Sequence, residues 1–363
     1  MNRQTTPKRA RGTSRRSSKR GLAPGSVVFI GAAREQAAGI SLIEYGSDAL
    51  RETRFTSLEQ SRLHEATLPF RWLNVYGVHD TSVLAEIGQR FNLHPLVLED
   101  IANTEQRPKV EDYGDQLFIV ARVLQLSDDG QTLSSEQFSL VLGRDFLLSF
   151  QERPTGSFEP VRERLRKSLG SLRSSGIDLL AYSLVDAVVD NYFGVIERID
   201  DRLDRLEEAL FERPASAQIA PLHEARRDTM ALRRALWPLR EVISSLQRGD
   251  HPLVMPETRV YLRDVQDHLT FLIESVDSMR ETLSGLLDVY LSAMSQRVNQ
   301  EVRILTVITT LFMPAALVAG VFGMNFRHMP WLDSPDGFLM ALALMAAIAA
   351  PLGMLFWRRH WLG

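Results

Sequence analysis

The sequence predicts an α+β membrane protein with an N-terminal cytoplasmic α/β domain, a long helical stalk and two C-terminal transmembrane helices. Three observations lead to this fold class. Strand patterns and short helical patterns alternate over residues 26–150 and then stop. A region without strand signals follows, in which apolar residues recur at helical spacing. Two uncharged apolar segments, residues 304–326 and 337–357, lie near the C-terminus.

The composition excludes several classes of site. The chain has 363 residues and no cysteine, which rules out a disulfide framework, a thiolate zinc site and a cysteine nucleophile. Residues 1–20 hold eight of the 42 basic side chains and none of the 45 acidic ones, so a basic tail precedes an acidic body. We expect residues 1–22 to be a disordered basic tail and not a twin-arginine leader, because Gly21, Pro24 and Gly25 interrupt the apolar stretch that follows.

Residues 23–157 are predicted to form the α/β domain. Six segments are rich in β-branched and aromatic residues and are bounded by Gly, Asp or Ser, which is typical of strands. They cover residues 27–32, 40–45, 70–78, 116–126, 136–143 and 145–152. Two short helical patterns lie between them, at residues 81–91 and 94–103.

Residues 158–301 are predicted to form a helical domain that includes the stalk. A heptad seam begins at Ile196 and continues to Leu210, and Pro214 ends that helix. The charged residues around the seam form either a solvated face with i,i+4 pairs or an acidic face that concentrates cations near a pore mouth. A second helix is expected from about residue 218 to residue 247.

The longest predicted helix begins at Pro256, a residue that favours the first helical position, and continues to Phe322 with only Pro314 inside it. Its length is roughly 100 Å at a rise of about 1.5 Å per residue. A helix of this length cannot be buried in one small domain. We expect it to pass from the cytoplasm into the bilayer and to pack against copies of itself.

The two apolar segments predict a hairpin in the cytoplasmic (inner) membrane, because each reaches the roughly 20 residues that a spanning helix needs. We assign residues 302–326 to the first span, 327–336 to an extracytoplasmic loop, 337–357 to the second span and 358–363 to a basic C-terminus. The alternative is a buried helical pair in a soluble core. Basic residues before the first span and after the second place both termini in the cytoplasm.

One face of the long helix can be followed at coiled-coil spacing. It is acidic and polar at first, then apolar, and finally small. Its members are Asp288, Leu291, Ser295, Asn299, Val302, Leu305, Thr309, Met313 and Ala316. This pore stripe is either an ordinary helix–helix seam or the lining of a pore between subunits, since two crossings per chain leave no room for a pore within one subunit.

Gly323, Met324 and Asn325, at the outer end of the first span, resemble the signature of the CorA family of magnesium/cobalt channels. The likeness covers essentially residues 26–363. Besides the two spans and their short loop, it rests on blocks at residues 94–111, 232–243, 262–269 and 286–326.

The resemblance implies a funnel-shaped homopentamer in the lipid bilayer, in which the first span of each subunit lines the pore. Gly323, Met324 and Asn325 match the selectivity motif. The pore positions of the family are matched by Asp288, Asn299, Val302, Leu305 and Met313. Mg²⁺ dehydrates reluctantly, so a ring of neutral Asn325 amides suits it by accepting hydrogen bonds from the first-shell water of the ion.

The resemblance also implies regulation by the transported ion. Asp100 and Asp264 match the acidic pair that holds a regulatory divalent cation between neighbouring subunits, and Glu99, Asp267 and His268 lie close to them in sequence. The outer loop departs from the family pattern, because Arg327 and Trp331 replace acidic residues. Asp333 and Asp336 partly restore the negative charge.

The expected function is uptake of Mg²⁺, with Co²⁺ and Ni²⁺ as further substrates, gated by intracellular Mg²⁺. A zinc transporter of the ZntB type and a membrane-tethered helical scaffold or sensor are the alternatives. The motifs of metalloproteases, P-loop proteins and serine hydrolases are absent from the sequence, so we do not expect an enzyme. We expect no nucleic-acid partner.

Overall fold

The computed structural model describes residues 21–31, 38–55, 60–61, 64–127, 129–212, 216–249, 251–324, 330–331 and 334–359. The chain divides into two compact units. The first comprises Met1–Arg205 and Pro221–Leu283, and the second comprises Leu206–Ala220 and Ser284–Gly363. The predicted boundaries at residues 157 and 301 follow a different criterion, the change from strand to helix to membrane patterns, and stay predictions.

The first unit is built on one seven-stranded sheet with the order β2-β1-β3-β7-β6-β5-β4. Neighbouring strands pair antiparallel, except that β3 and β7 pair parallel. The strands are β1 (Gly39–Tyr45), β2 (Leu50–Phe55), β3 (Phe70–Tyr76), β4 (Lys109–Asp112), β5 (Leu117–Leu126), β6 (Leu133–Leu142) and β7 (Phe146–Gln151).

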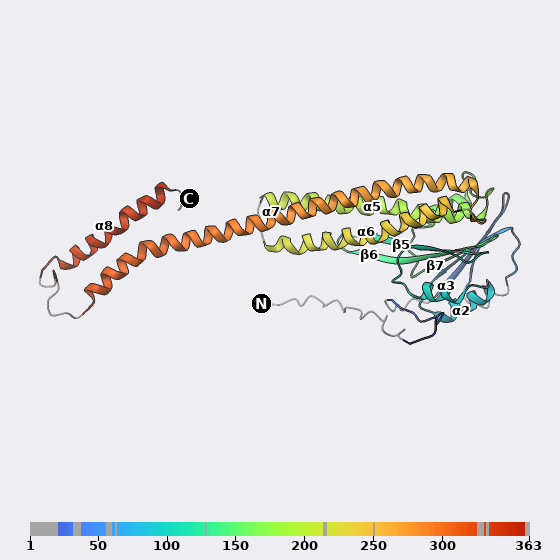
Figure 1. The fold of residues 1–363 in the computed structure, drawn as a ribbon, viewed down its shortest axis with the longest axis horizontal. Helices are drawn as coiled ribbons and strands as arrows, with labels where there is room; N and C mark the ends of the chain where they lie inside the picture. Colours follow the sequence, from blue (N-terminus) through green and yellow to red (C-terminus); the bar gives the residue numbers. More distant parts are fainter. Residues whose placement is uncertain are drawn as a thin grey trace. The chain divides into compact units, whose positions relative to one another are not determined.

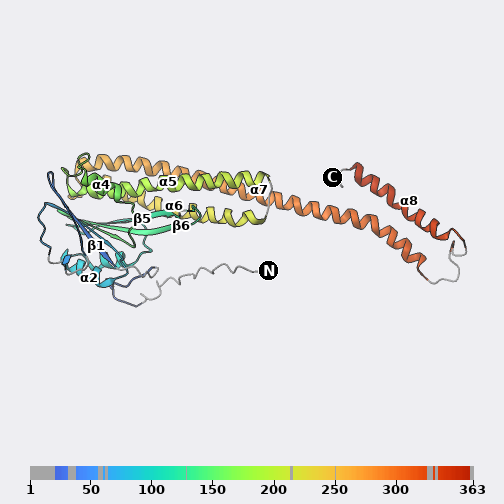
Figure 2. The same cartoon turned by 180° about the vertical axis from the view of Figure 1, so that it is seen from behind.

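Helices cover both faces of this sheet (Figures 1 and 2). One face carries α2 (Thr81–Arg90) and α3 (Pro95–Ala102), and the other carries α5 (Ile177–Glu212), α6 (Ile219–Arg248) and the first part of α7 (Pro256–Phe322). The remaining helices are α4 (Glu159–Arg166), the short 3-10 helix η2 (Ser216–Gln218) and α8 (Gly337–Arg358). Because both faces are covered, the central strands are buried in nearly continuous runs.

The structure differs from the strand predictions at three places. Within the described part of segment 27–32, Ile30 forms one isolated bridge with Asn103 and no strand is present. Conversely, β2 and β4 were not predicted. They form the two edges of the sheet, where charged residues are tolerated because one side of the strand faces solvent. Their sequences, LRETRF and KVED, therefore lack the apolar alternation of a typical strand.

The long helices were predicted well. The structure gives α6 as Ile219–Arg248 and α7 as Pro256–Phe322, with Pro314 inside α7. The first part of α7 buries one face at alternating steps of three and four residues. The buried seam consists of Leu262, Val265, Leu269, Leu272, Val276, Met279, Leu283, Leu286 and Tyr290.

Burial on α7 changes abruptly after Tyr290. Between residues 291 and 322 Val307 is the one buried side chain, whereas Phe312 and Leu317 are 70% and 68% exposed. On α8, Phe338 is 76% exposed. Such apolar surface is unfavourable in water and needs an apolar environment.

Among the described residues, three helices are long and apolar enough to cross a membrane, although two were predicted. The third is α5, whose most apolar window is 61% buried within the protein, compared with 6% for the windows of α7 and α8. The apolar residues of α5 therefore pack into the core. In the second unit, a Cβ placed at Gly353 of α8 would lie 3.9 Å from Leu311 of α7, so the two helices approach closely at this point.

A buried polar network joins β3 to β7. The Asn74 side-chain carbonyl accepts hydrogen bonds from Ser149 Oγ at 2.7 Å and from Gln151 Nε2 at 2.6 Å. Ser149 Oγ in turn accepts from Trp72 Nε1 at 2.8 Å. All four side chains are buried, so each bond replaces a water contact that the core cannot supply.

We predict that Asn74→Ala lowers the free energy of unfolding by about 2 kcal/mol or more, because two buried donors lose their acceptor. The midpoint of thermal unfolding of the full-length protein in detergent measures this effect. Gln131→Ala, at an exposed position, serves as control and should shift the midpoint little. Equal midpoints for the two variants would contradict the prediction.

Candidate functional site

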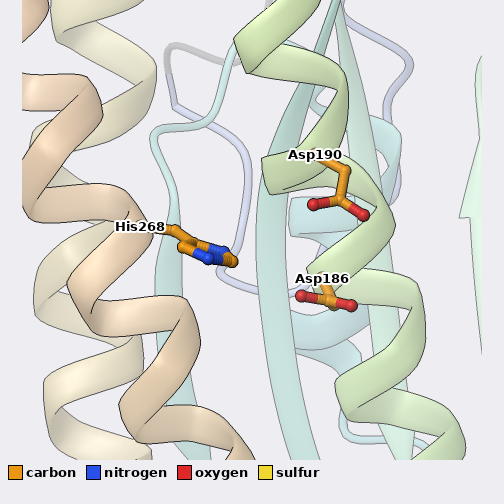
Figure 3. A group of neighbouring side chains, drawn as sticks. All are labelled: Asp186, Asp190 and His268. Atoms are coloured by element: carbon orange, nitrogen blue, oxygen red, sulfur yellow. The ribbon is translucent and has the colours of Figure 1, made fainter.

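Two helices of the first unit bring together a group that could hold a metal ion. Asp186 and Asp190 lie one turn apart on α5, and His268 extends toward them from α7 (Figure 3). One ligand atom from each side chain lies within 4.8 Å of those of the other two. We call this group the α5–α7 cluster.

The carboxylates of the α5–α7 cluster are poorly compensated. Burial raises the pKa of Asp186 from its ordinary value of 3.8 to about 6, and the neighbouring charge of Asp190 adds to this rise. Arg164 and His268 act in the opposite direction but do not cancel it. The ionised form of Asp186 is therefore disfavoured, and a bound cation would relieve that cost.

His268 is oriented by its neighbours. The Phe193 ring meets its imidazole edge to face at 5.6 Å, and Asp264 Oδ2 lies 3.9 Å from Nε2. Its Nδ1 atom is buried and has no hydrogen-bond partner among the described residues. Two carboxylates and a free imidazole nitrogen fit a divalent cation that retains several waters. Oxygen ligands suit Mg²⁺, and the imidazole makes the group acceptable to Co²⁺, Ni²⁺ or Zn²⁺ as well.

Asp100, at the end of α3, lies in a separate network of the same unit. Its Oδ2 accepts a hydrogen bond from Lys109 Nζ at 2.6 Å, and its Oδ1 accepts one from Gln106 Nε2. Lys109 Nζ also contacts Glu111 Oε1 at 2.7 Å. The side chain of Asp100 is 17% exposed, so solvent and ions reach it from one side only.

The other predicted regulatory residues are also on the first unit. Asp264 is exposed on α7, where it contacts His268, and Asp267 is exposed one position before that histidine. Glu99 Oε2 accepts a hydrogen bond from the Gly25 backbone at 2.7 Å. Within one chain Asp100 and Asp264 have different neighbours, so their pairing across a subunit interface stays a prediction.

The pore stripe lies on the second unit and is exposed along its whole length in the single chain. Leu305 and Met313 are each 64% exposed. Thr309 is exposed, and its hydroxyl donates to the Leu305 carbonyl at 2.8 Å, so the polar group of this side chain is satisfied within its own helix. Every member is therefore available to contact another chain or a pore.

The predicted selectivity motif, which begins at Gly323, follows directly after α7. The Gly323 N–H donates to the Ala319 carbonyl and the Met324 N–H to the Val321 carbonyl, so both residues continue the last turn. Asn325, Arg327 and Asp333 lie outside the described residues. Asp336 precedes α8, and its backbone carbonyl accepts a hydrogen bond from the Met340 N–H at 2.9 Å.

Two aromatic side chains of the second unit contact each other. Phe322 and Trp331 stack with an interplanar angle of 8° and ring centroids 5.9 Å apart. The stacking fixes the backbone at Trp331 to the end of α7.

Asp186, Asp190 and Lys109 were not predicted as site residues. Asp186 and Asp190 stand four residues apart in the mostly apolar first part of α5, which is an unusual place for two carboxylates and was a usable signal. The sequence alone does not show that Asp186 and Asp190 meet His268, because His268 lies far along the chain from α5. Lys109 was overlooked because it falls in a charged edge strand.

The fold and the site together define a class of protein. Helices that expose this much apolar surface are typical of membrane proteins, and the α5–α7 cluster offers ligands that suit a divalent cation. The chain belongs to the CorA-like Mg²⁺ transporter protein family, whose sequence pattern matches residues 69–359.

Relatives support this assignment. The chain is 43% identical over 354 residues to the cobalt/magnesium transport protein CorA of Thermotoga maritima, a match that covers 96% of this chain and 99% of that protein. The complete structure of the CorA magnesium transporter from Methanocaldococcus jannaschii shares the fold, with a TM-score of 0.74 over 91% of this chain and 100% of that chain at 21% identity. The zinc transport protein ZntB of Yersinia enterocolitica is 27% identical and covers 84% of this chain.

We predict that Asp186→Asn raises the midpoint of thermal unfolding at pH 7.5 when divalent cations are removed with EDTA. The native pKa of Asp186 is raised, so its ionisation destabilises the native state as the pH rises from about 4 through about 6. The gain should therefore shrink as the pH falls toward about 3, below the pKa of both states, where both bind the proton. Asp201→Asn, at an exposed position of α5, serves as control. A gain that does not depend on pH would contradict this explanation.

Proposed function

We propose that the protein is a divalent cation channel that takes up Mg²⁺, with Co²⁺ and Ni²⁺ as further substrates, and that intracellular Mg²⁺ closes it. The observation that carries this proposal is the 43% identity, over almost the whole chain, to a cobalt/magnesium transport protein. The zinc transporter is the weaker alternative, because the ZntB relative is 27% identical.

The membrane arrangement follows from the apolar helices. Residues 302–326 and 337–357 form two spans of the cytoplasmic membrane, with both termini in the cytoplasm. The exposed apolar side chains of α7 and α8 support this arrangement, because lipid removes their contact with water. The basic Arg358 at the end of α8 agrees with a cytoplasmic C-terminus.

Five copies of the chain form the pore, and the pore stripe of α7 lines it. The exposure of this stripe on one chain supports the proposal, since each of its nine members, from Asp288 at one end to Ala316 at the other, is free to face an axis. The carboxylates of Asp288 attract cations at the cytoplasmic end. Val302 and Leu305 form an apolar constriction that closes by excluding water.

The ion reaches this pore through the motif formed by Gly323, Met324 and Asn325. The amide oxygens of five Asn325 residues accept hydrogen bonds from the water shell of the ion, so the ion enters without losing that shell. Neutral ligands bind a divalent cation weakly enough for it to leave again. Asp333 and Asp336 offset the positive charge of Arg327 in the outer loop.

Regulation depends on carboxylates that repel one another when no ion is bound. Asp100 of one subunit and Asp264 of the next hold a divalent cation between them. Asp264 lies beside His268, which links this pair to the α5–α7 cluster. When intracellular Mg²⁺ falls, the sites empty and the symmetric closed ring loses the contacts that stabilise it.

We predict that Asn325→Ala abolishes Mg²⁺ influx into liposomes while the protein still elutes as the same oligomer, because the ring of amide acceptors is lost. Ser334→Ala, in the same outer segment, serves as control and should transport normally. Influx at the wild-type rate in the Asn325 variant would refute the filter assignment. Zn²⁺ influx in the wild type without Mg²⁺ influx would favour the ZntB-like alternative.

We predict that the double variant Asp100→Ala/Asp264→Ala loses protection from proteolysis by Mg²⁺, because the ion no longer bridges subunits. The measurement is the rate of cleavage of the full-length protein across a Mg²⁺ series. Asp48→Ala/Asp129→Ala, two exposed aspartates on loops, is the matched control. If Mg²⁺ protects the double variant at the wild-type concentration, the two aspartates are not the sensor.

A further inference from the structure

The Asp100 network contains a cation of its own. Lys109 Nζ lies 2.6 Å from Asp100 Oδ2 and 2.7 Å from Glu111 Oε1, so one ammonium group bridges two carboxylates. The three side chains are 27%, 17% and 37% exposed respectively, which places the bridge at the edge of solvent and not within the core.

The rest of the network holds this bridge in place. The Tyr113 hydroxyl donates to the other oxygen of Glu111 at 3.0 Å, and Gln106 donates to the other oxygen of Asp100. Lys109 Nζ also lies 5.8 Å from the centre of the Phe118 ring. Lys109 is therefore held by two ion pairs and by its contact with the Phe118 ring, and its two carboxylate partners have hydrogen bonds of their own. Exposed ion pairs usually lack such additional contacts.

We infer that Lys109 is a built-in counter-ion that competes with the regulatory divalent cation for Asp100 and sets the concentration at which that cation binds. The inference rests on the proposed role of Asp100 as a ligand of the ion. The same carboxylate oxygen that the ion needs is occupied by the ammonium group when no ion is present. Binding of the ion is thus an exchange of one cation for another.

Two effects make this exchange unfavourable for the ion. The hydrogen bond between Lys109 and Asp100 has to be broken, and the displaced ammonium group stays tethered a few ångströms away, where it repels a divalent cation. Even with water-like screening, one unit charge about 6 Å from a divalent cation changes its binding constant by about tenfold. The lysine therefore weakens the site, which suits a sensor of an abundant ion.

The same ion pair could also serve stability alone, in which case its loss would loosen the fold and leave the affinity for the ion unchanged. The charge of Lys109 separates the two roles. Lys109→Gln removes the charge but keeps an N–H donor for Asp100, and Lys109→Arg keeps the charge. Lys167→Gln breaks a comparable pair, Lys167 with Glu163 at 2.8 Å, at an exposed site on the surface, and is the matched control.

The experiment measures the Mg²⁺ concentration that gives half-maximal protection of the full-length protein from chymotrypsin, a protease that does not cleave at lysine. Thermal unfolding without Mg²⁺ is recorded for every variant. We expect Lys109→Gln to lower the half-maximal concentration about tenfold. Lys109→Arg and Lys167→Gln should keep the wild-type value.

Three outcomes are distinguishable. A tenfold decrease in Lys109→Gln alone supports the inference. A wild-type or higher half-maximal concentration in Lys109→Gln, while Asp100→Asn abolishes protection, overturns the inference and leaves the sensor assignment intact. If Asp100→Asn is protected like the wild type, the proposed sensor fails, and the competition with Lys109 fails with it.

Discussion

The long helix α7 has to be stable in two different environments, and the rest of the structure depends on how its surface changes between them. Up to Tyr290 it buries one face in a heptad seam against the other helices, and most of its exposed side chains are polar. Beyond that residue the seam stops and apolar side chains are exposed on several faces. A helix can change in this way only where its surroundings change from protein and water to lipid or to other copies of the chain.

This division also fixes where charged residues can act. Asp264 and His268 flank the buried seam in the first part of α7, so Asp264 is exposed and His268 half-buried beside α5 without disturbing the core. Asp288 lies where the seam ends and the exposed apolar part begins. One continuous helix therefore carries the residues proposed to sense the ion and those proposed to conduct it. No loop has to transmit a change from one to the other, because rotation or bending of the helix affects both.

Features governed by periodicity could be predicted from the sequence. The limits of α7 and α8 followed from apolar spacing, from Pro256 and from the absence of charge, all of which are local properties. The edge strands β2 and β4 could not be predicted, because their partners, and not their own residues, make them strands. The segment with Val27 and Phe29 shows the opposite case. It is apolar enough for a strand, but it packs on the core without joining the sheet.

The same distinction applies to the residues proposed to bind a metal ion. Asp100 and Asp264 were found through a resemblance, whereas the geometry around them is a tertiary property. The two carboxylate groups differ in how they are compensated: at Asp100 a lysine already neutralises charge, while in the α5–α7 cluster burial and repulsion leave Asp186 reluctant to ionise. A bound ion can shift the equilibrium between two states of a protein only if its contacts or the strain that it relieves differ between them. Both groups supply such a difference. At Asp100 the ion has to displace Lys109, and in the α5–α7 cluster it relieves the repulsion between Asp186 and Asp190.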